Sequence, residues 1–124
     1  MTRTVKIPDA THPITVTPTE GRVRVTINGQ QVADTQHALS LAESTYPVAQ
    51  YIPLADVDPA VLRPSDTTTY CPFKGDASYY SVETQDGTTH DDVIWTYLHP
   101  YDAVAPIEGH VAFYANKAEV VVEA

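Results

Sequence analysis

Residues 22–34 read Arg-Val-Arg-Val-Thr-Ile-Asn-Gly-Gln-Gln-Val-Ala-Asp, and this stretch decides the fold class. From Arg22 to Ile27, polar and apolar side chains alternate, as they do along a strand with one buried face. The Asn28-Gly29 dipeptide that follows favours a type I′ turn, because both central residues of that turn need positive φ. Gln30 to Asp34 is therefore expected to return as the second strand of a β-hairpin.

The sequence beyond this hairpin favours further short strands over long helices. Ten prolines interrupt the chain, and its short apolar runs are rich in Thr, Val and Tyr, which suit strands. Five more strands are expected in the second half: Thr67 to Cys71, Ala77 to Thr84, Val93 to Leu98, Val111 to Tyr114 and Glu119 to Glu123. The predicted fold class is mainly β, with one or two short helical turns.

Four segments are predicted as connections or as an edge. His37 to Glu43 is expected to form a turn or two of helix, held only by tertiary packing. Tyr51 to Pro53 is expected at a sheet edge, because its proline cannot donate a hydrogen bond to a neighbouring strand. Asp58 to Arg63 should form one helical turn opened by Asp and Pro and ended by the next proline. Asp102 to Ile107 should make a short helical excursion.

The composition indicates one acidic domain over residues 1–124. Its length suits a single core, and 43% apolar against 19% charged residues is enough for the chain to fold alone. The net charge of −9 repels phosphodiester backbones, which excludes nucleic acid as a partner. The sequence lacks both a signal peptide and the run of about 18 apolar residues that a membrane span needs. We therefore expect a soluble, cytoplasmic protein without a membrane partner.

The densest group of chemically active side chains lies between Thr67 and Tyr80. A thiol, an amine, hydroxyls and aromatic rings occur together there. If the first part of this segment is extended, Thr69 and Cys71 share one face. The next strand can then present Tyr79 to the same cavity. This segment is the centre of the predicted site.

Lys74 is the only formal cation between Pro64 and Asn116, within an acidic stretch. Because Gly75 lets the backbone bend sharply after it, the flexible lysine stem could turn back over the cavity. It would then form a clamp for an anion or a carbonyl group. The alternative is a solvated turn lysine in loose ion pairs with Asp76 and its acidic neighbours.

Cys71 also allows two interpretations. A nearby Lys74 ammonium would stabilise the thiolate and make Cys71 a nucleophile or redox group. Against this, an unpaired cysteine usually behaves as a small buried hydrophobe. Because Cys71 is the only cysteine in the sequence, an intramolecular disulfide and a multi-cysteine zinc site are both excluded. The five histidines lack the close spacing of zinc ligands, so neither a metal nor a cofactor is predicted.

Trp95 and Tyr97 alternate onto one face of their predicted strand, opposite Ile94 and Thr96. One of the two faces should pack in the core. Trp95 and Tyr97 could therefore be core residues or the wall of a pocket, and their polar tips need partners wherever they are buried.

A family resemblance rests on these segments: Tyr51-Ile52-Pro53, Asp56-Val57, Leu62, Ser65-Asp66, Thr69-Tyr70-Cys71-Pro72-Phe73-Lys74-Gly75, Ala77-Ser78-Tyr79-Tyr80, Trp95-Thr96-Tyr97, Pro100, and Ile107-Glu108-Gly109-His110-Val111-Ala112-Phe113-Tyr114. Through them nearly the whole chain resembles a bacterial family, the domain of unknown function 427, which carries a nucleotidyltransferase-like label. The resemblance implies a β-tent fold, in which two small antiparallel sheets meet at an angle over a pocket. It also implies a set of pocket residues: Tyr51, Thr69, Cys71, Lys74, Gly75, Tyr79, Trp95, Tyr97 and Pro100.

The expected function is small-molecule binding. The sequence lacks the glycine-rich phosphate loop and the paired aspartates of a nucleotidyltransferase, so that activity is not carried over from the label. In the expected pocket, Trp95, Tyr97 and Tyr79 form the walls, while Lys74 and Thr69 hold a polar or planar metabolite. Two alternatives stay open: an enzyme that uses Cys71 with help from Lys74, and a structural or interaction domain without a ligand. The oligomeric state also stays open, with a homodimer among the alternatives.

Overall fold

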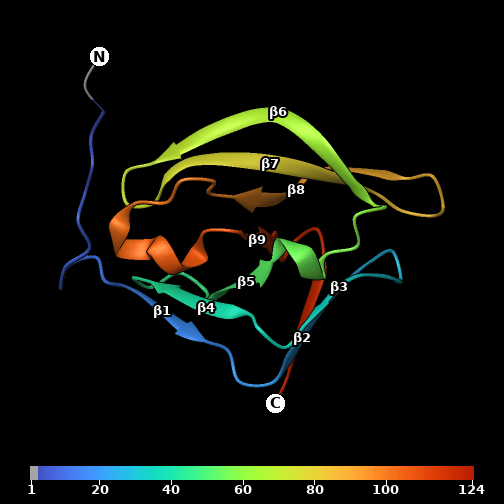
Figure 1. Ribbon diagram of the computed structural model, residues 1–124, viewed down its shortest axis with the longest axis horizontal. Coiled ribbons are helices and arrows are strands. Elements are labelled where there is room, and N and C mark those ends of the chain that lie inside the picture. Colours follow the sequence, from blue (N-terminus) through green and yellow to red (C-terminus); the bar gives the residue numbers. More distant parts are fainter. Residues whose placement is uncertain (1–2) are drawn as a thin grey trace.

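Two antiparallel sheets contain all the strands of the computed structural model, which describes residues 3–124 (Figure 1). The larger sheet has the strand order β1-β4-β5-β9-β8-β7-β6, and the smaller has the order β10-β2-β3. The strands are β1 (Ile14–Pro18), β2 (Arg22–Ile27), β3 (Gln30–Thr35), β4 (Leu39–Glu43), β5 (Ala49–Pro53), β6 (Leu62–Cys71), β7 (Gly75–Glu83), β8 (Thr89–Thr96), β9 (His110–Phe113) and β10 (Glu119–Glu123). Helical structure in the described residues is limited to two short 3-10 helices, η1 (Leu54–Asp56) and η2 (Asp102–Ile107). The predicted mainly β class, with two antiparallel sheets and short helical turns, is confirmed.

The hairpin of β2 and β3 forms as predicted. Asn28 and Gly29 have φ values of 51° and 77°, both positive as a type I′ turn requires. Alternate residues of β2 point inward, so that Val23, Val25 and Ile27 are at most 2% exposed. On its other side β2 pairs with β10, which makes β2 the central strand of the small sheet.

Two apolar cores lie on opposite faces of the large sheet. Tyr51 and Ile52 are consecutive residues of β5, so they point to opposite faces, and both are almost fully buried. The core that contains Ile52 also contains the inward-facing residues of the small sheet. The core that contains Tyr51, here called the second core, includes Val104 and Ile107 of η2. In Figure 1, η2 (orange) lies between β8 and β4.

Two segments differ from their predictions because strands pair with them. His37 to Glu43 is not helical: Leu39–Glu43 forms β4, which pairs with β1 on one side and β5 on the other. Pairing on both sides outweighs the weak helix preference of so short a segment. Tyr51 to Pro53 is not an edge, because β5 pairs with both β4 and β9. Its proline is tolerated as the last residue of the strand.

The second half of the chain follows the predicted order of strands. The helical turn predicted over Asp58 to Arg63 is not formed: a hydrogen-bonded turn stands at its start, and Leu62 and Arg63 instead pair with β7 as the first residues of β6. Pro64 lies within β6, which is the edge strand of the large sheet, where a missing N–H is tolerated. The predicted excursion over Asp102 to Ile107 is confirmed as η2.

The large sheet opens between β5 and β9. The C-terminal end of β5 pairs with β9, so that Ile52 lies opposite Val111. Continued by two residues, this register would pair Gln50 with Phe113, but the two strands have already parted. The N-terminal part of β5 is paired only on its other edge, with β4. This separation positions the candidate site.

Gly21 and Gly29 offer a matched test of how closely the end of β10 approaches the start of β2. Both have positive φ, but a Cβ at Gly21 would overlap the backbone of Glu123, whereas one at Gly29 would meet nothing within 4 Å. Gly29→Ala should cost about 1–2 kcal/mol of stability from backbone strain alone. Gly21→Ala should cost more, because it also displaces the end of β10. Urea unfolding of both variants measures the two losses, and equal losses would contradict this arrangement.

Candidate functional site

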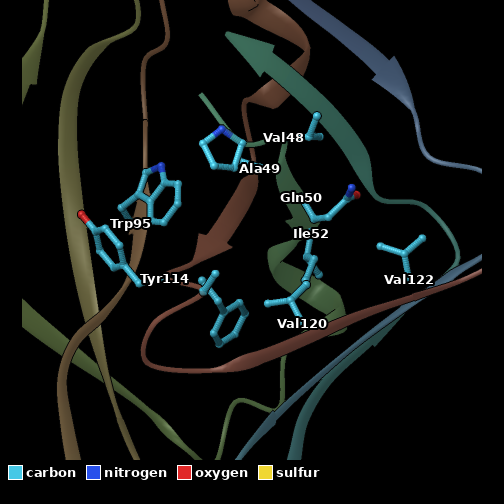
Figure 2. Close-up of a pocket in the computed structure, with 11 residues that line it drawn as sticks. Val48, Ala49, Gln50, Ile52, Trp95, Tyr114, Val120 and Val122 are labelled. Carbon is cyan, nitrogen blue, oxygen red and sulfur yellow. The ribbon is translucent and has the colours of Figure 1, made fainter. Parts of the chain in front are cut away.

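A cavity of about 480 Å³ lies where β5 and β9 part (Figure 2). Trp95 and Tyr114 form one wall, and Val48 and Gln50 lie on the other side of the space. The residues that line the cavity include no Asp, Glu, Lys, Arg or His. The site is therefore aromatic and aliphatic, and its surroundings disfavour a charged occupant.

The rim of the cavity exposes apolar side chains to solvent. Val48, just before β5, is 54% exposed, and Val122 of β10 is 46% exposed. Val120 also lines the cavity and, like Val122, sits opposite a buried valine of β2. These valines thus belong to the inward face of the small sheet, and the cavity leaves them partly uncovered.

Trp95 joins this cavity to the second core. Its indole Nε1 donates a hydrogen bond of 2.9 Å to the hydroxyl of Tyr51, and the two rings are nearly perpendicular. On the other side, the ring of Tyr114 lies 4.5 Å from that of Trp95, measured between centroids. Tyr51, Trp95 and Tyr114 thus form the polar-aromatic cluster of the structure.

Hydroxyl groups continue the cluster onto β6 and β7. The Tyr114 hydroxyl donates to that of Tyr79 at 3.4 Å, and the Tyr79 hydroxyl lies 2.9 Å from Thr69 Oγ1. Burial and the hydrogen bond to Tyr79 raise the pKa of Tyr114 to about 12. Burial also holds the pKa of Tyr51 well above its ordinary value. These phenols are therefore neutral hydrogen-bonding groups at physiological pH.

A largely buried ion pair lies in the same region of the fold. Lys74 Nζ is 2.5 Å from Glu43 Oε1, and His12 Nε2 is 2.8 Å from Glu43 Oε2. The side chains of Lys74 and Glu43 are only 12% and 13% exposed. Burial by itself would raise the pKa of Glu43, but the hydrogen bonds and charges of Lys74 and His12 outweigh it and lower the pKa below its ordinary value. Asp76, two residues after Lys74 in sequence, pairs with Arg3 instead.

The structure distributes the predicted site residues over several places. Trp95 lines the cavity, and Thr69 and Tyr79 reach it through Tyr114. The second core or its margin holds Tyr51, Cys71 and Tyr97. Lys74 Nζ lies 5.8 Å from the centre of the Tyr97 ring. Gly75 opens β7 with a φ of 112°, and Pro100 lines a smaller pocket beside the N-terminal segment.

Sequence reasoning missed several residues of the site. Glu43 lies in the segment wrongly predicted as helical, and no local pattern links it to Lys74, 31 positions away. Tyr114 belongs to a motif that carries the family resemblance, which was a usable signal. Val48 and Gln50 became visible only once the separation of β5 from β9 was known.

Two further features are absent from residues 3–124. No group of three or more His, Cys, Asp or Glu side chains is arranged there to hold a metal ion. No helix in this part of the chain is both long enough and apolar enough to cross a membrane.

The ion pair predicts a pH-dependent contribution to stability. Because folding lowers the pKa of Glu43, its carboxylate stabilises the fold above the ordinary glutamate pKa, and this contribution disappears as the pH falls through the lowered value. Glu43→Gln should therefore cost about 1–3 kcal/mol at neutral pH, and the difference from the unmodified protein should shrink near pH ~3.

Urea unfolding at both pH values measures this difference. Glu83→Gln is the matched control, because its pair with Arg63 is about half exposed and should contribute at most about 1 kcal/mol. A Glu43→Gln loss as small as that of the control, or one independent of pH, would contradict the role assigned to the buried pair.

The comparisons with known proteins agree with the motifs of the sequence. Among curated proteins the chain has no match. Residues 15–124 match the family described as Domain of unknown function (DUF427), which carries the label NTP_transf_9. This match includes nine of the strands in full, β2 to β10, and all of β1 except its first residue. The chain therefore belongs to the DUF427 family.

Proposed function

We propose that this domain binds a small, planar, uncharged molecule in the cavity beside Trp95. The observation that carries the proposal is an aromatic cavity with an exposed apolar rim. Its volume of about 480 Å³ falls within the range of roughly 300–1,000 Å³ that small-molecule sites occupy. Such sites are lined mainly by apolar and aromatic side chains with a few polar groups, which describes this lining.

The lining also suggests the chemistry of the ligand. Trp95 and Tyr114 offer aromatic surfaces against which a flat molecule can pack. Gln50 supplies a polar group: its Oε1 accepts a hydrogen bond from Thr19, and its Nε2 donates to Ser40. A carboxamide has two N–H bonds, so one remains for a ligand oxygen or ring nitrogen. A planar heterocycle or amide would satisfy these features.

The rim provides a test that leaves the core intact. Val48→Asp should abolish the thermal stabilisation given by a ligand found in a metabolite library, because it places a charge at the mouth of an apolar cavity. A ligand at 100 times its dissociation constant should add about 2.7 kcal/mol to the stability of the unmodified protein.

Leu98→Asp is the matched control for Val48→Asp. Leu98 is equally exposed, at 54%, but does not line the cavity. The proposal expects it to keep the full ligand response. Failure of any compound to stabilise the unmodified protein, or equal responses from the two variants, would favour a structural domain without a ligand.

The alternative of an enzyme with Cys71 as nucleophile has less support. The Lys74 ammonium pairs with Glu43, and within residues 3–124 the thiol makes no hydrogen bond. Cys71 is half-buried and packs against the second core. These contacts suit a packing role better than an activated nucleophile.

Cys71→Ser separates these two alternatives. If the domain only binds its ligand, Cys71→Ser should keep the same thermal response to the ligand. In the protein that retains Cys71, a thiol reagent should then react much faster after unfolding than before. The enzyme would be supported by two results together. The thiol reagent would react rapidly with the folded protein unless ligand is present, and Cys71→Ser would lose the ability to convert the ligand.

A further inference from the structure

Gln50, which lines the cavity, belongs to a closed ring of hydrogen bonds (Figure 2). Thr19 Oγ1 donates to Gln50 Oε1 at 2.6 Å, and Gln50 Nε2 donates to Ser40 Oγ at 3.1 Å. The hydroxyl oxygens of Thr19 and Ser40 lie 2.7 Å apart. Because the Thr19 proton is directed to Gln50, the Ser40 proton completes the ring. We call Thr19, Ser40 and Gln50 the hydrogen-bond ring.

Strand pairing assembles the hydrogen-bond ring. Ser40 of β4 and Gln50 of β5 are directly opposite each other in the sheet, so their side chains lie close together. Thr19 follows β1, the other neighbour of β4, and its backbone N–H donates to the carbonyl of Ala38 at 2.9 Å. All three side chains of the ring are half-buried. The ring is therefore a built part of the sheet at the edge of the cavity.

No outside group fixes the direction of the ring. Within residues 3–124, the two hydroxyls and the Gln50 amide bond only to one another. Turning the amide over exchanges its nitrogen and its oxygen, and the ring then closes in the opposite direction once both hydroxyl protons have turned. Ser40 Oγ lies 3.1 Å from Nε2 and 3.4 Å from Oε1, so it is within reach of both amide atoms.

The two directions of the ring are close in free energy, because they contain the same kinds of bond. Each has one bond from the amide N–H to a hydroxyl, one from a hydroxyl to the carbonyl, and one between hydroxyls. The 2.6 Å bond from Thr19 suits an O–H donor better than an N–H donor, which favours the direction seen in the structure. A ligand that bonds only to the other direction shifts this balance toward it.

Reversal changes the group that Gln50 offers to a ligand. In the direction seen, the second N–H of the amide remains to donate; in the reversed direction the carbonyl oxygen takes its place and accepts. We propose that Gln50 determines which hydrogen-bonding edge a ligand presents, and that it admits both kinds. Thr19 and Ser40 are positioning residues that reverse with it. The admitted ligands are flat molecules with an acceptor, such as a ring nitrogen or a carbonyl, or with a donor, such as a ring N–H. This inference rests on the proposed function, because it concerns the same cavity.

Two pairs of probes test this inference. Quinoline and naphthalene have the same shape, but only quinoline carries an acceptor; indole and indene are likewise matched, but only indole carries a donor. NMR titration of the isotope-labelled protein gives the dissociation constant of each probe. The quantity compared is the affinity of each heterocycle relative to its hydrocarbon.

Gln50→Met is the reference variant, because it keeps a side chain of similar size and removes both hydrogen-bonding groups. Comparison with it cancels the difference in how water solvates the two members of a pair. The relative affinities of quinoline and of indole should each fall by roughly threefold to tenfold in Gln50→Met. A fall for quinoline alone would show that the ring keeps one direction and would overturn the proposal.

Two further variants fix the ring in opposite directions. The carboxylate of Ser40→Asp only accepts, so it holds the amide nitrogen of Gln50 toward itself, as in the structure. This variant should keep the relative affinity for quinoline and lose that for indole. Gln50→Glu has no N–H and should keep the relative affinity for indole and lose that for quinoline. Each variant adds one negative charge, so each controls for the charge of the other.

The remaining outcomes separate the two proposals. Binding of all four probes with the same relative affinities in the unmodified protein and in Gln50→Met would overturn the role of Gln50 and leave the cavity as a binding site. Loss of the same heterocycle in Ser40→Asp and Gln50→Glu would also overturn the reversal. Binding of none of the probes to the unmodified protein would overturn the proposed function, and this inference with it.

Discussion

The fold depends on the way β5 divides its hydrogen bonds between two neighbours. Its N-terminal part pairs with β4 and its C-terminal end with β9, so a single five-residue strand holds the two halves of the large sheet together. Because neighbouring residues of a strand face opposite ways, β5 also feeds both cores, Ile52 on one face and Tyr51 on the other. On the N-terminal side of Ile52, β5 no longer pairs with β9, and the cavity occupies the gap between these two strands.

The parts of the fold that were predictable are those that local chemistry decides. Asn28 and Gly29 both take positive φ, and the tight turn that they form sets how β2 pairs with β3. All of this information lies within one short stretch of sequence. The segment that became β4 could not be read in this way. Its five residues are too few to show a clear period, and their partners lie in β1 and β5, which local sequence does not reveal.

The candidate site shows the same division between local and distant information. Trp95 and Tyr97 were identifiable, because large aromatic residues with polar tips stand out in a short strand. Their roles were not, since these depend on which elements approach them: Trp95 borders a cavity, whereas Tyr97 is buried beside Lys74. The pairing of Lys74 with Glu43 required β4 to be a strand, so the error over that segment hid the partner of the lysine.

The bond between Trp95 and Tyr51 connects the cavity to the second core. The indole forms part of the cavity wall while its N–H donates to the Tyr51 hydroxyl, which belongs to the second core. That bond fixes the Tyr51 hydroxyl and leaves its proton as the group still able to donate. A flat ligand in the cavity would pack against an indole whose orientation this bond fixes. The second core thus has a role beyond packing, because its Tyr51 hydroxyl holds the indole that lines the cavity.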